Sequence, residues 1–269
     1  MNAVAKKQIE ADLVDRFGHA FEKPEKRSRE VLSSGIGEID RVCAGFPRGS
    51  ITEIHGTATS GRTTLMLAAL AAATLSEETC ALIDCSDTFD LWSATKAQVS
   101  FDRLLWVRCH SNLERAFKAT DLLLHSGGFG LVALNLADMP SRTLRRIIST
   151  WWFRFRRALE NTPTVLLVLT PIACARSCAA MALELQREAA VWAASDSFST
   201  RAENQALAPE DCSAKHLSLV ATDDRKSPPQ PALPNHAHFL RAATVRVNRE
   251  RPVGLATRPV RFTASLECA

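Results

Sequence analysis

One stretch, residues 49–65, constrains the fold of this chain more than any other. Its sequence, GSITEIHGTATSGRTTL, joins a short β-branched run to a glycine-bounded loop, and two threonines then open an apolar helix. This order is typical of a phosphate-binding loop, whose pattern G-x-x-x-x-G-K-[ST] is met at Gly56, Gly61 and Thr63. Arg62 stands where the lysine belongs. Because its planar fork is bulkier than an ammonium group, the loop favours phosphate binding over efficient hydrolysis.

Strands and helices alternate after this loop. Apolar runs that predict strands are ITEIH, CALIDCS, RLLWVRC, GLVALNLA and TVLLVLTPI, and the helices expected between them cover residues 63–75, 90–99, 112–126 and 141–160. Such alternation indicates a mostly parallel, twisted sheet with helices on both faces. We predict an α/β fold of the P-loop NTPase type, with the loop at the carboxyl edge of the sheet, where such folds bind ligands.

The N-terminal residues 1–30 are expected to form a helix and a linker. Ile9, Leu13 and Phe17 are spaced by four residues and share one helical face. That apolar face either docks on another subunit as an oligomer contact or packs on its own domain.

The remaining segments follow from changes in pattern. Residues 31–194 are the expected core, in which residues 175–192 are predicted to form an apolar helix. Residues 195–235 lose periodicity, gather Ser, Asp, Glu and Pro, and predict a loose or disordered linker. Residues 236–269 alternate with a period of two, which predicts a terminal hairpin that completes the core sheet.

Charge and hydropathy argue against several classes of protein. The 33 Lys and Arg residues nearly balance 29 Asp and Glu residues, so no global field commits the chain to nucleic acid or anionic lipid. No apolar run approaches the roughly 18 residues of a membrane span, and the start lacks a secretion signal. We expect a cytoplasmic protein without membrane contact. The 8 cysteines include no C-x-x-C pair and are predicted to be reduced core thiols.

The loop defines the candidate ligand site. Its backbone N–H groups would point at phosphate oxygens, helped by the positive end of the following helix, and the Thr63 hydroxyl would ligate Mg²⁺ held by the nucleotide. The expected ligands are ATP and Mg²⁺, and the alternative is a glycine-rich turn without a ligand. The predicted nucleotide-binding residues are Gly56, Thr59, Ser60, Gly61, Arg62, Thr63 and Thr64.

Two basic segments are candidate surfaces for DNA or a protein partner. Arginine interleaved with aromatic residues on the helix after Pro140 can bind single-stranded nucleic acid or an acidic partner. The alternative is a core-facing apolar stripe with a solvated basic face. Arginines of the terminal hairpin could track phosphates, or could protect an edge strand from aggregation. The candidates are Arg142, Arg145, Arg146, Arg154, Arg156, Arg157, Arg246 and Arg249.

Residues 8–172 resemble a RecA-type recombinase core, and more narrowly the ImuA-type RecA-like accessory proteins of bacterial mutagenesis operons. The matching features are the helix ending in RFG, LSSGIGEID, PRGSITEIHG with its TATSGRTTL loop, CALIDCSDTFD and the apolar strand GLVALNLAD. From residue 173 onward only the narrower resemblance supports the predicted helix and hairpin. The two DNA-binding loops of RecA also differ, because the first is cut to ADMPS and the second is replaced by ARSCAAMALELQREAAVW.

Carried over residue by residue, the resemblance implies a loss of catalysis. The glutamate that positions the attacking water in RecA corresponds to Ser86, the aspartate that organises magnesium corresponds to Asn135, and the glutamine that senses the γ-phosphate corresponds to Pro171. The adenine-contacting aspartate is kept as Asp90. Asp87, beside Ser86, is expected to face away from the site. These departures predict no catalytic residues at the degenerate positions.

The resemblance therefore implies an accessory protein of DNA repair, the SOS response and translesion synthesis, without efficient ATP hydrolysis. Its expected partners are a RecA-type protomer or a second copy, bound through the N-terminal helix, an inactive Y-family polymerase of the ImuB type and an error-prone replicative-type polymerase. Single-stranded DNA is a further candidate. The alternatives are an active ATP-dependent recombinase or damage sensor, and a scaffold that binds neither nucleotide nor DNA.

Overall fold

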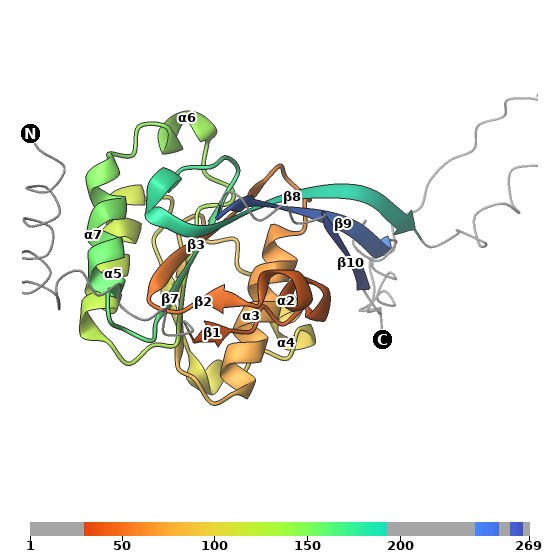
Figure 1. The fold of residues 1–269 in the computed structure, drawn as a ribbon, viewed down its shortest axis with the longest axis horizontal. Helices are drawn as coiled ribbons and strands as arrows, with labels where there is room; N and C mark the ends of the chain where they lie inside the picture. The colour runs from red at the N-terminus through yellow and green to blue at the C-terminus, as the bar shows by residue number, and fades with distance from the viewer. Residues whose placement is uncertain (1–29, 193–239, 253–258, 266–269) are drawn as a thin grey trace, which may run out of the picture.

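An eight-stranded sheet forms the centre of the molecule, with strand order β10-β9-β8-β3-β7-β6-β4-β5 (Figure 1). The computed structural model describes residues 30–192, 240–252 and 259–265. The predicted α/β fold with a mostly parallel sheet is confirmed. The parallel strands are β3 (Ser50–Gly56), β4 (Cys80–Asp84), β5 (Leu104–Arg108), β6 (Leu131–Asn135), β7 (Val165–Thr170) and β8 (Ala179–Trp192).

Helices cover both faces of this sheet and create two cores (Figure 1). Strand residues alternate between these cores, so that Ile54 packs in one and Ile51 in the other. The first core includes residues of α2 (Gly37–Cys43), α3 (Arg62–Leu75) and α4 (Leu91–Lys96). The second includes residues of α5 (Leu113–Ser126), α6 (Ser141–Leu144) and α7 (Ser149–Leu159). The smaller elements are β1 (Val31–Leu32), β2 (Phe46–Pro47), η1 (Phe101–Arg103) and η2 (Arg176–Cys178).

Local sequence explains the two longest helices. Helix α3 is rich in alanine and leucine and is buried along most of its 14 residues, as the sequence predicts. Helix α5 begins after Asn112, whose side chain accepts a hydrogen bond from the Arg115 backbone N–H at 3.0 Å. Helix α4 is shorter than predicted, because it ends at Lys96.

The single long helix predicted after Pro140 is wrong. Two helices, α6 and α7, are separated by residues 145–148. Ile148 is extended, with φ −70° and ψ 135°, and forms the N-terminal boundary of α7. It follows Ile147, and two consecutive β-branched residues have low helix propensity. The break lets Leu144 and Trp152 pack in the same core.

The apolar helix predicted at residues 175–192 is also wrong, because most of this segment is the 14-residue strand β8. Alanine, leucine and glutamate favour a helix locally. Tertiary context decides otherwise, because β8 pairs in parallel with β3 and antiparallel with β9. Met181, Leu183 and Leu185 are buried in the first core, at the alternating spacing of a strand.

The predicted terminal hairpin is confirmed by β9 (Leu240–Arg251) and β10 (Val260–Ser265), which pair antiparallel. Strand β9 adds to β8, so the hairpin completes one edge of the main sheet. The predicted N-terminal helix and the predicted linker at residues 195–235 lie outside the described residues. Among the helices that are described, none has the length and apolar character to cross a bilayer. The six cysteines in the described ranges are free and buried.

Candidate nucleotide site

The loop between β3 and α3 has the geometry of a tight phosphate-binding turn. Thr59 has a positive φ of 62°, and Gly61, with φ 90°, lies immediately before α3. The Ser60 backbone N–H donates to the Thr57 carbonyl at 3.3 Å, which closes a turn inside the loop. Sequence and structure therefore agree that a strand, a loop and a helix follow one another here.

Two close approaches explain the glycines. A Cβ atom on Gly56 would lie 2.3 Å from the Leu185 carbonyl oxygen, because β3 and β8 pair at this point. A Cβ atom on Gly61 would lie 2.8 Å from a methyl group of Val245, in addition to the strain of its positive φ. Strand β9 thus packs directly under the phosphate-binding turn.

Several groups of the loop fit an anionic phosphate. The first N–H groups of α3, at Arg62, Thr63 and Thr64, have no acceptor within the helix, as at every helix start. The Ser60 side chain is 1% exposed, and its hydroxyl is buried without a hydrogen-bond partner among the described residues. A buried hydroxyl without a partner is costly unless a ligand or water satisfies it. The residues present therefore fit phosphate.

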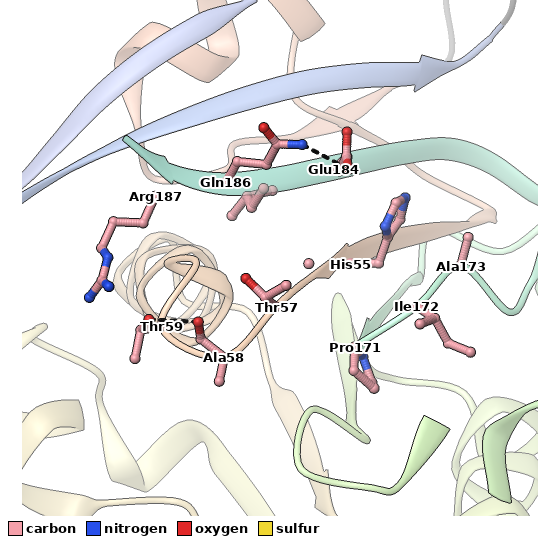
Figure 2. A pocket seen from close by; sticks show the side chains of 12 residues that line it. His55, Thr57, Ala58, Thr59, Pro171, Ile172, Ala173, Glu184, Gln186 and Arg187 are labelled. Carbon is pink, nitrogen blue, oxygen red and sulfur yellow. Dashed lines mark hydrogen bonds between the residues drawn. The ribbon is translucent and has the colours of Figure 1, made fainter. Parts of the chain in front are cut away.

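A cavity of about 570 Å³ opens beside the loop (Figure 2). Three segments line it: residues 55–59 of β3 and the loop, residues 171–173 after β7, and residues 184–187 of β8. The loop and its neighbours thus form a space large enough for a small ligand. Residues 184–187 were missed because the sequence predicted a helix there. The alternation of Met181, Leu183 and Leu185 could have revealed the strand.

Of the predicted nucleotide-binding loop residues, Gly56 and Thr59 line this cavity, whereas Ser60, Gly61, Arg62, Thr63 and Thr64 do not. The Arg62 side chain is directed to the end of β6, where Nη1 donates to the Ala137 carbonyl oxygen at 3.2 Å. Arg62 is only 6% exposed, and burial lowers the pKa of its guanidinium, against the opposing charge of Asp138. The residue at the lysine position thus serves a packing and hydrogen-bonding role.

Asn135, at the end of β6, joins a buried network with Asp84. Its side-chain nitrogen donates to Asp84 Oδ1 at 3.3 Å, and its Oδ1 accepts from the Ala137 N–H at 3.1 Å. The other Asp84 oxygen accepts from the Phe89 N–H at 2.8 Å. Asp84 is fully buried, so this carboxylate braces two strand ends. Asn135 adds no charge for a cation, and Thr63, exposed at the start of α3, is the predicted protein ligand for nucleotide-bound Mg²⁺.

Ser86 and Pro171 are the other positions at which the resemblance implies a loss of catalysis. Asp87 is engaged away from Ser86, because its Oδ2 lies 2.6 Å from His110 Nδ1 and its Oδ1 lies 3.6 Å from Arg108 Nε. Pro171 lines the cavity directly after β7 and has no side-chain donor or acceptor. Within the described ranges, no group of three His, Cys, Asp or Glu side chains is arranged to hold a metal.

Glu53 holds the segment that follows Pro171. One oxygen, Oε1, accepts hydrogen bonds from the backbone N–H groups of Cys174 at 2.5 Å and Ala175 at 3.0 Å. It also lies 3.5 Å from the Thr170 hydroxyl. Burial raises the pKa of the Glu53 carboxyl, whose residue is 1% exposed. A carboxyl on the phosphate-loop strand thereby positions one wall of the cavity.

Asp90, predicted to contact adenine, is the N-cap of α4. Its Oδ2 accepts from the Ser93 hydroxyl at 2.6 Å and from the Ser93 N–H at 2.8 Å. These hydrogen bonds hold the pKa of Asp90 below its ordinary value. The local structure therefore gives Asp90 a capping role, and its contact with adenine stays a prediction.

In α6 and α7, buried aromatic residues face the core, whereas most of the candidate arginines face solvent. Trp152 and Phe155 are buried around Phe117, with ring centroids 5.4 Å from it, so these two aromatics belong to the core. Arg154 pairs with Asp121 through two contacts of 2.6 Å. The remaining helix candidates are exposed: Arg142, Arg145, Arg146, Arg156 and Arg157.

The hairpin arginines are more occupied. Arg246 lies 3.2 Å from Glu188, and Arg261 shares the same carboxylate at 2.6 Å. Arg249 Nε donates to the Arg251 carbonyl oxygen at 3.2 Å. Arg246 is thus joined to β8 through Glu188. The predicted oligomer-contact residues Ile9, Leu13 and Phe17 lie outside the described residues.

Fold and loop together define a P-loop α/β protein. A family model described as the RecA N-terminal domain matches residues 3–141, more than half of the chain. The chain belongs to the RecA family.

Individual relatives of this chain are also RecA proteins. Protein RecA of Acinetobacter baumannii is 37% identical over 108 residues, which cover 39% of this chain and 31% of that protein. Protein RecA of Deinococcus radiodurans is 38% identical over 108 residues, covering 39% of this chain and 30% of that protein. These matches span only about a third of the length of the relatives.

Proposed function

We propose that this protein is a RecA-family accessory factor in DNA repair and damage tolerance that does not hydrolyse ATP efficiently. The observation that carries the proposal is the contact between the Arg62 guanidinium and the Ala137 carbonyl at 3.2 Å, which occupies the group expected to bind phosphate. Asn135 supports it, because its amide pairs with Asp84 where the family would hold a carboxylate.

The magnitudes favour an inactive enzyme. Loss of a group that positions water costs about 10²- to 10⁴-fold, and loss of a charge-stabilising group about 10²- to 10³-fold. These effects are not additive. From an ordinary turnover of about 10 per second, the smaller losses together leave about 10⁻³ per second. A filament cycle driven by ATP would stall at this rate.

Nucleotide, in this proposal, is a structural ligand of the loop. ATP or ADP would be held by the loop N–H groups, with Thr63 as the protein ligand to nucleotide-bound Mg²⁺. The free first-turn N–H groups and the orphaned Ser60 hydroxyl support this role. Binding to the folded state alone would raise the midpoint of thermal unfolding. A scaffold that binds no nucleotide would show no such shift.

Protein contacts supply the finer function. The ImuA-type resemblance of residues 8–172 supports a cytoplasmic role in the SOS response, in which the protein joins error-prone translesion synthesis. Its proposed partners are an inactive Y-family polymerase of the ImuB type and an error-prone replicative-type polymerase. The apolar residues Ile9, Leu13 and Phe17 are proposed to dock on a RecA-type protomer or a second copy.

An ATPase assay with and without single-stranded DNA tests the proposal. We expect no DNA-stimulated hydrolysis and no strand exchange, which would also exclude an active recombinase. DNA-stimulated turnover that is lost in Arg62→Ala would contradict the proposal. A pull-down with and without residues 1–20 tests the partners, and an unchanged set of partners would refute the docking role of Ile9, Leu13 and Phe17.

A further inference from the structure

Arg187 of β8 supplies a positively charged side chain to the cavity beside the loop. Arg62, at the expected position, is buried and bonded to Ala137, and it does not line the cavity. Arg187 lines the cavity together with Thr57 and Thr59 of the loop. The arginine that lines the cavity therefore lies 125 residues after Arg62 in the sequence.

Strand register explains why Arg187 reaches this place. Strands β3 and β8 pair in parallel, with Gly56 opposite Leu185, so Arg187 lies two residues beyond the last paired position, at the level of the loop. Leu183 and Leu185 face the first core. Residues two apart in a strand share a face, so Arg187 lies on the α3 side.

Figure 2 shows this arrangement directly. The Arg187 side chain extends from β8 toward the side of the sheet where the loop and α3 lie, whereas Glu184 and Gln186 point to the opposite side. Glu184 is occupied there by hydrogen bonds from Gln186 at 3.0 Å and Asn248 at 3.2 Å. Neither polar neighbour competes with a ligand for the guanidinium.

Arg187 is also free of acidic partners in the part of the chain that the structure describes. Its neighbour Glu188 pairs with Arg246 and Arg261 at 3.2 and 2.6 Å. His55, another cavity residue, contacts Glu250 at 2.9 Å. No described carboxylate lies within ion-pair distance of Arg187, whose side chain is exposed at the mouth of the cavity.

We propose that Arg187 binds the polyphosphate of a nucleoside di- or triphosphate held by the loop, in place of Arg62. This inference rests on the nucleotide binding in the proposed function. The planar guanidinium matches two phosphate oxygens at once, and loop residues 57–59 line the same cavity. The phosphates lie between the loop N–H groups and Arg187, which links the ligand to β8 and the hairpin paired with it.

Titration calorimetry of the full chain with MgADP tests the assignment, because it measures binding without turnover. A charge-assisted hydrogen bond to phosphate predicts that Arg187→Gln weakens MgADP binding by about 10- to 100-fold. Arg187→Lys retains the charge but loses the planar guanidinium, so its affinity for MgADP is expected to lie between those of the wild type and Arg187→Gln. Inorganic pyrophosphate should show the same loss, whereas binding of adenosine should be unchanged.

A matched control separates this site from general charge effects. Arg115→Gln removes an exposed arginine from α5, which contributes no residue to the cavity. It should bind MgADP within about twofold of the wild type, as expected for a remote surface change. Hydrogen exchange supplies a second measurement: MgADP should protect the β8 amides in the wild type and not in Arg187→Gln.

Three results would overturn the inference. Arg187→Gln could bind MgADP as the wild type does, or Arg62→Gln, not Arg187→Gln, could cause the loss. The wild type could also fail to bind MgADP and pyrophosphate, which removes the site itself. The accessory role would still be decided separately, since ATP turnover and partner capture test it without reference to Arg187.

Discussion

The Arg62 guanidinium donates to the carbonyl oxygen of Ala137 at 3.2 Å, which ties the first turn of α3 to the end of β6. Both residues are buried. The arginine of the phosphate-binding pattern therefore holds two elements together. This contact explains how a loop can keep its shape while the residue at its lysine position no longer faces the cavity.

Substitution of Arg62 tests that role. Arg62→Ala should lower the free energy of unfolding by about 1 to 3 kcal/mol, because the Ala137 carbonyl loses its donor in a buried place. Arg62→Lys should not produce ATP turnover, since Ser86, Asn135 and Pro171 are unchanged. Urea denaturation and a phosphate-release assay measure the two effects. Turnover of Arg62→Lys near 1 per second, toward the ordinary enzyme range, would contradict this view.

Asn135→Asp tests whether the family carboxylate can be restored. The new carboxylate would face Asp84 Oδ1 in place of a donor now 3.3 Å away, and Asp84 is fully buried. Two buried carboxylates in contact repel each other, so we expect a loss of about 2 to 4 kcal/mol at pH 7 and a smaller loss near pH 5, where one becomes protonated. Denaturation at both pH values measures this. An equal loss at both would argue against charge repulsion.

The buried carboxyl of Glu53 should make the free energy of unfolding depend on pH. Burial raises its pKa above the unfolded value, so the folded state binds the proton more tightly. The stability from this group is fully present below the unfolded pKa of about 4.3 and declines as the pH rises through the folded pKa. Glu53→Gln keeps an acceptor for the Cys174 and Ala175 N–H groups but cannot ionise.

The unfolding free energy of wild type minus Glu53→Gln should therefore fall as the pH rises from 4.5 toward 8, in urea denaturation series. Glu53→Ala leaves two buried N–H groups without an acceptor and should cost about 2 to 4 kcal/mol. A difference between wild type and Glu53→Gln that does not change with pH would show that this carboxyl is not buried as described.

Gly61 and Val245 form a coupled pair across the loop and the hairpin. Gly61→Ala places a methyl group 2.8 Å from Val245 at φ 90°, and should cost about 2 to 4 kcal/mol. In Gly61→Ala/Val245→Ala the clash is relieved, so the double variant should be more stable than the sum of the single losses predicts, by about 1 kcal/mol. Strict additivity in denaturation experiments would mean that β9 does not press on the loop.

The arginines of α7 and those of the terminal hairpin differ in their ion pairs, and this difference predicts which surface binds single-stranded DNA more tightly. Arg156 and Arg157 are exposed and have no acidic partner among the described residues, whereas Arg246 pairs with Glu188. If single-stranded DNA binds, Arg156→Gln/Arg157→Gln should weaken it and reduce the salt slope by about 0.7 per lost phosphate contact. Arg246→Gln/Arg249→Gln should change both quantities less. Fluorescence anisotropy at several salt concentrations measures them, and the reverse ranking would place the DNA on the hairpin.

The sequence alone determined the class of fold and the position of the loop. Five apolar strands and the helices between them carry their own periodicity, and Gly56, Gly61 and Thr63 mark a turn whose spacing is local. The terminal hairpin was predictable for the same reason, since apolar and polar residues alternate along β10 and around Val245 and Val247 of β9. These local patterns agree with the pairings that the tertiary structure makes, so the elements that they predict are kept.

Only the tertiary structure decided the identity of β8 and the direction of Arg62. The segment 179–192 consists mostly of good helix formers, and it is a strand because β3 and β9 offer hydrogen bonds on both sides. Arg62 meets Ala137 and Arg187 meets the loop through pairings between residues that are far apart in sequence. No local pattern contains these contacts, because the sheet order that creates them arises only when the whole core packs.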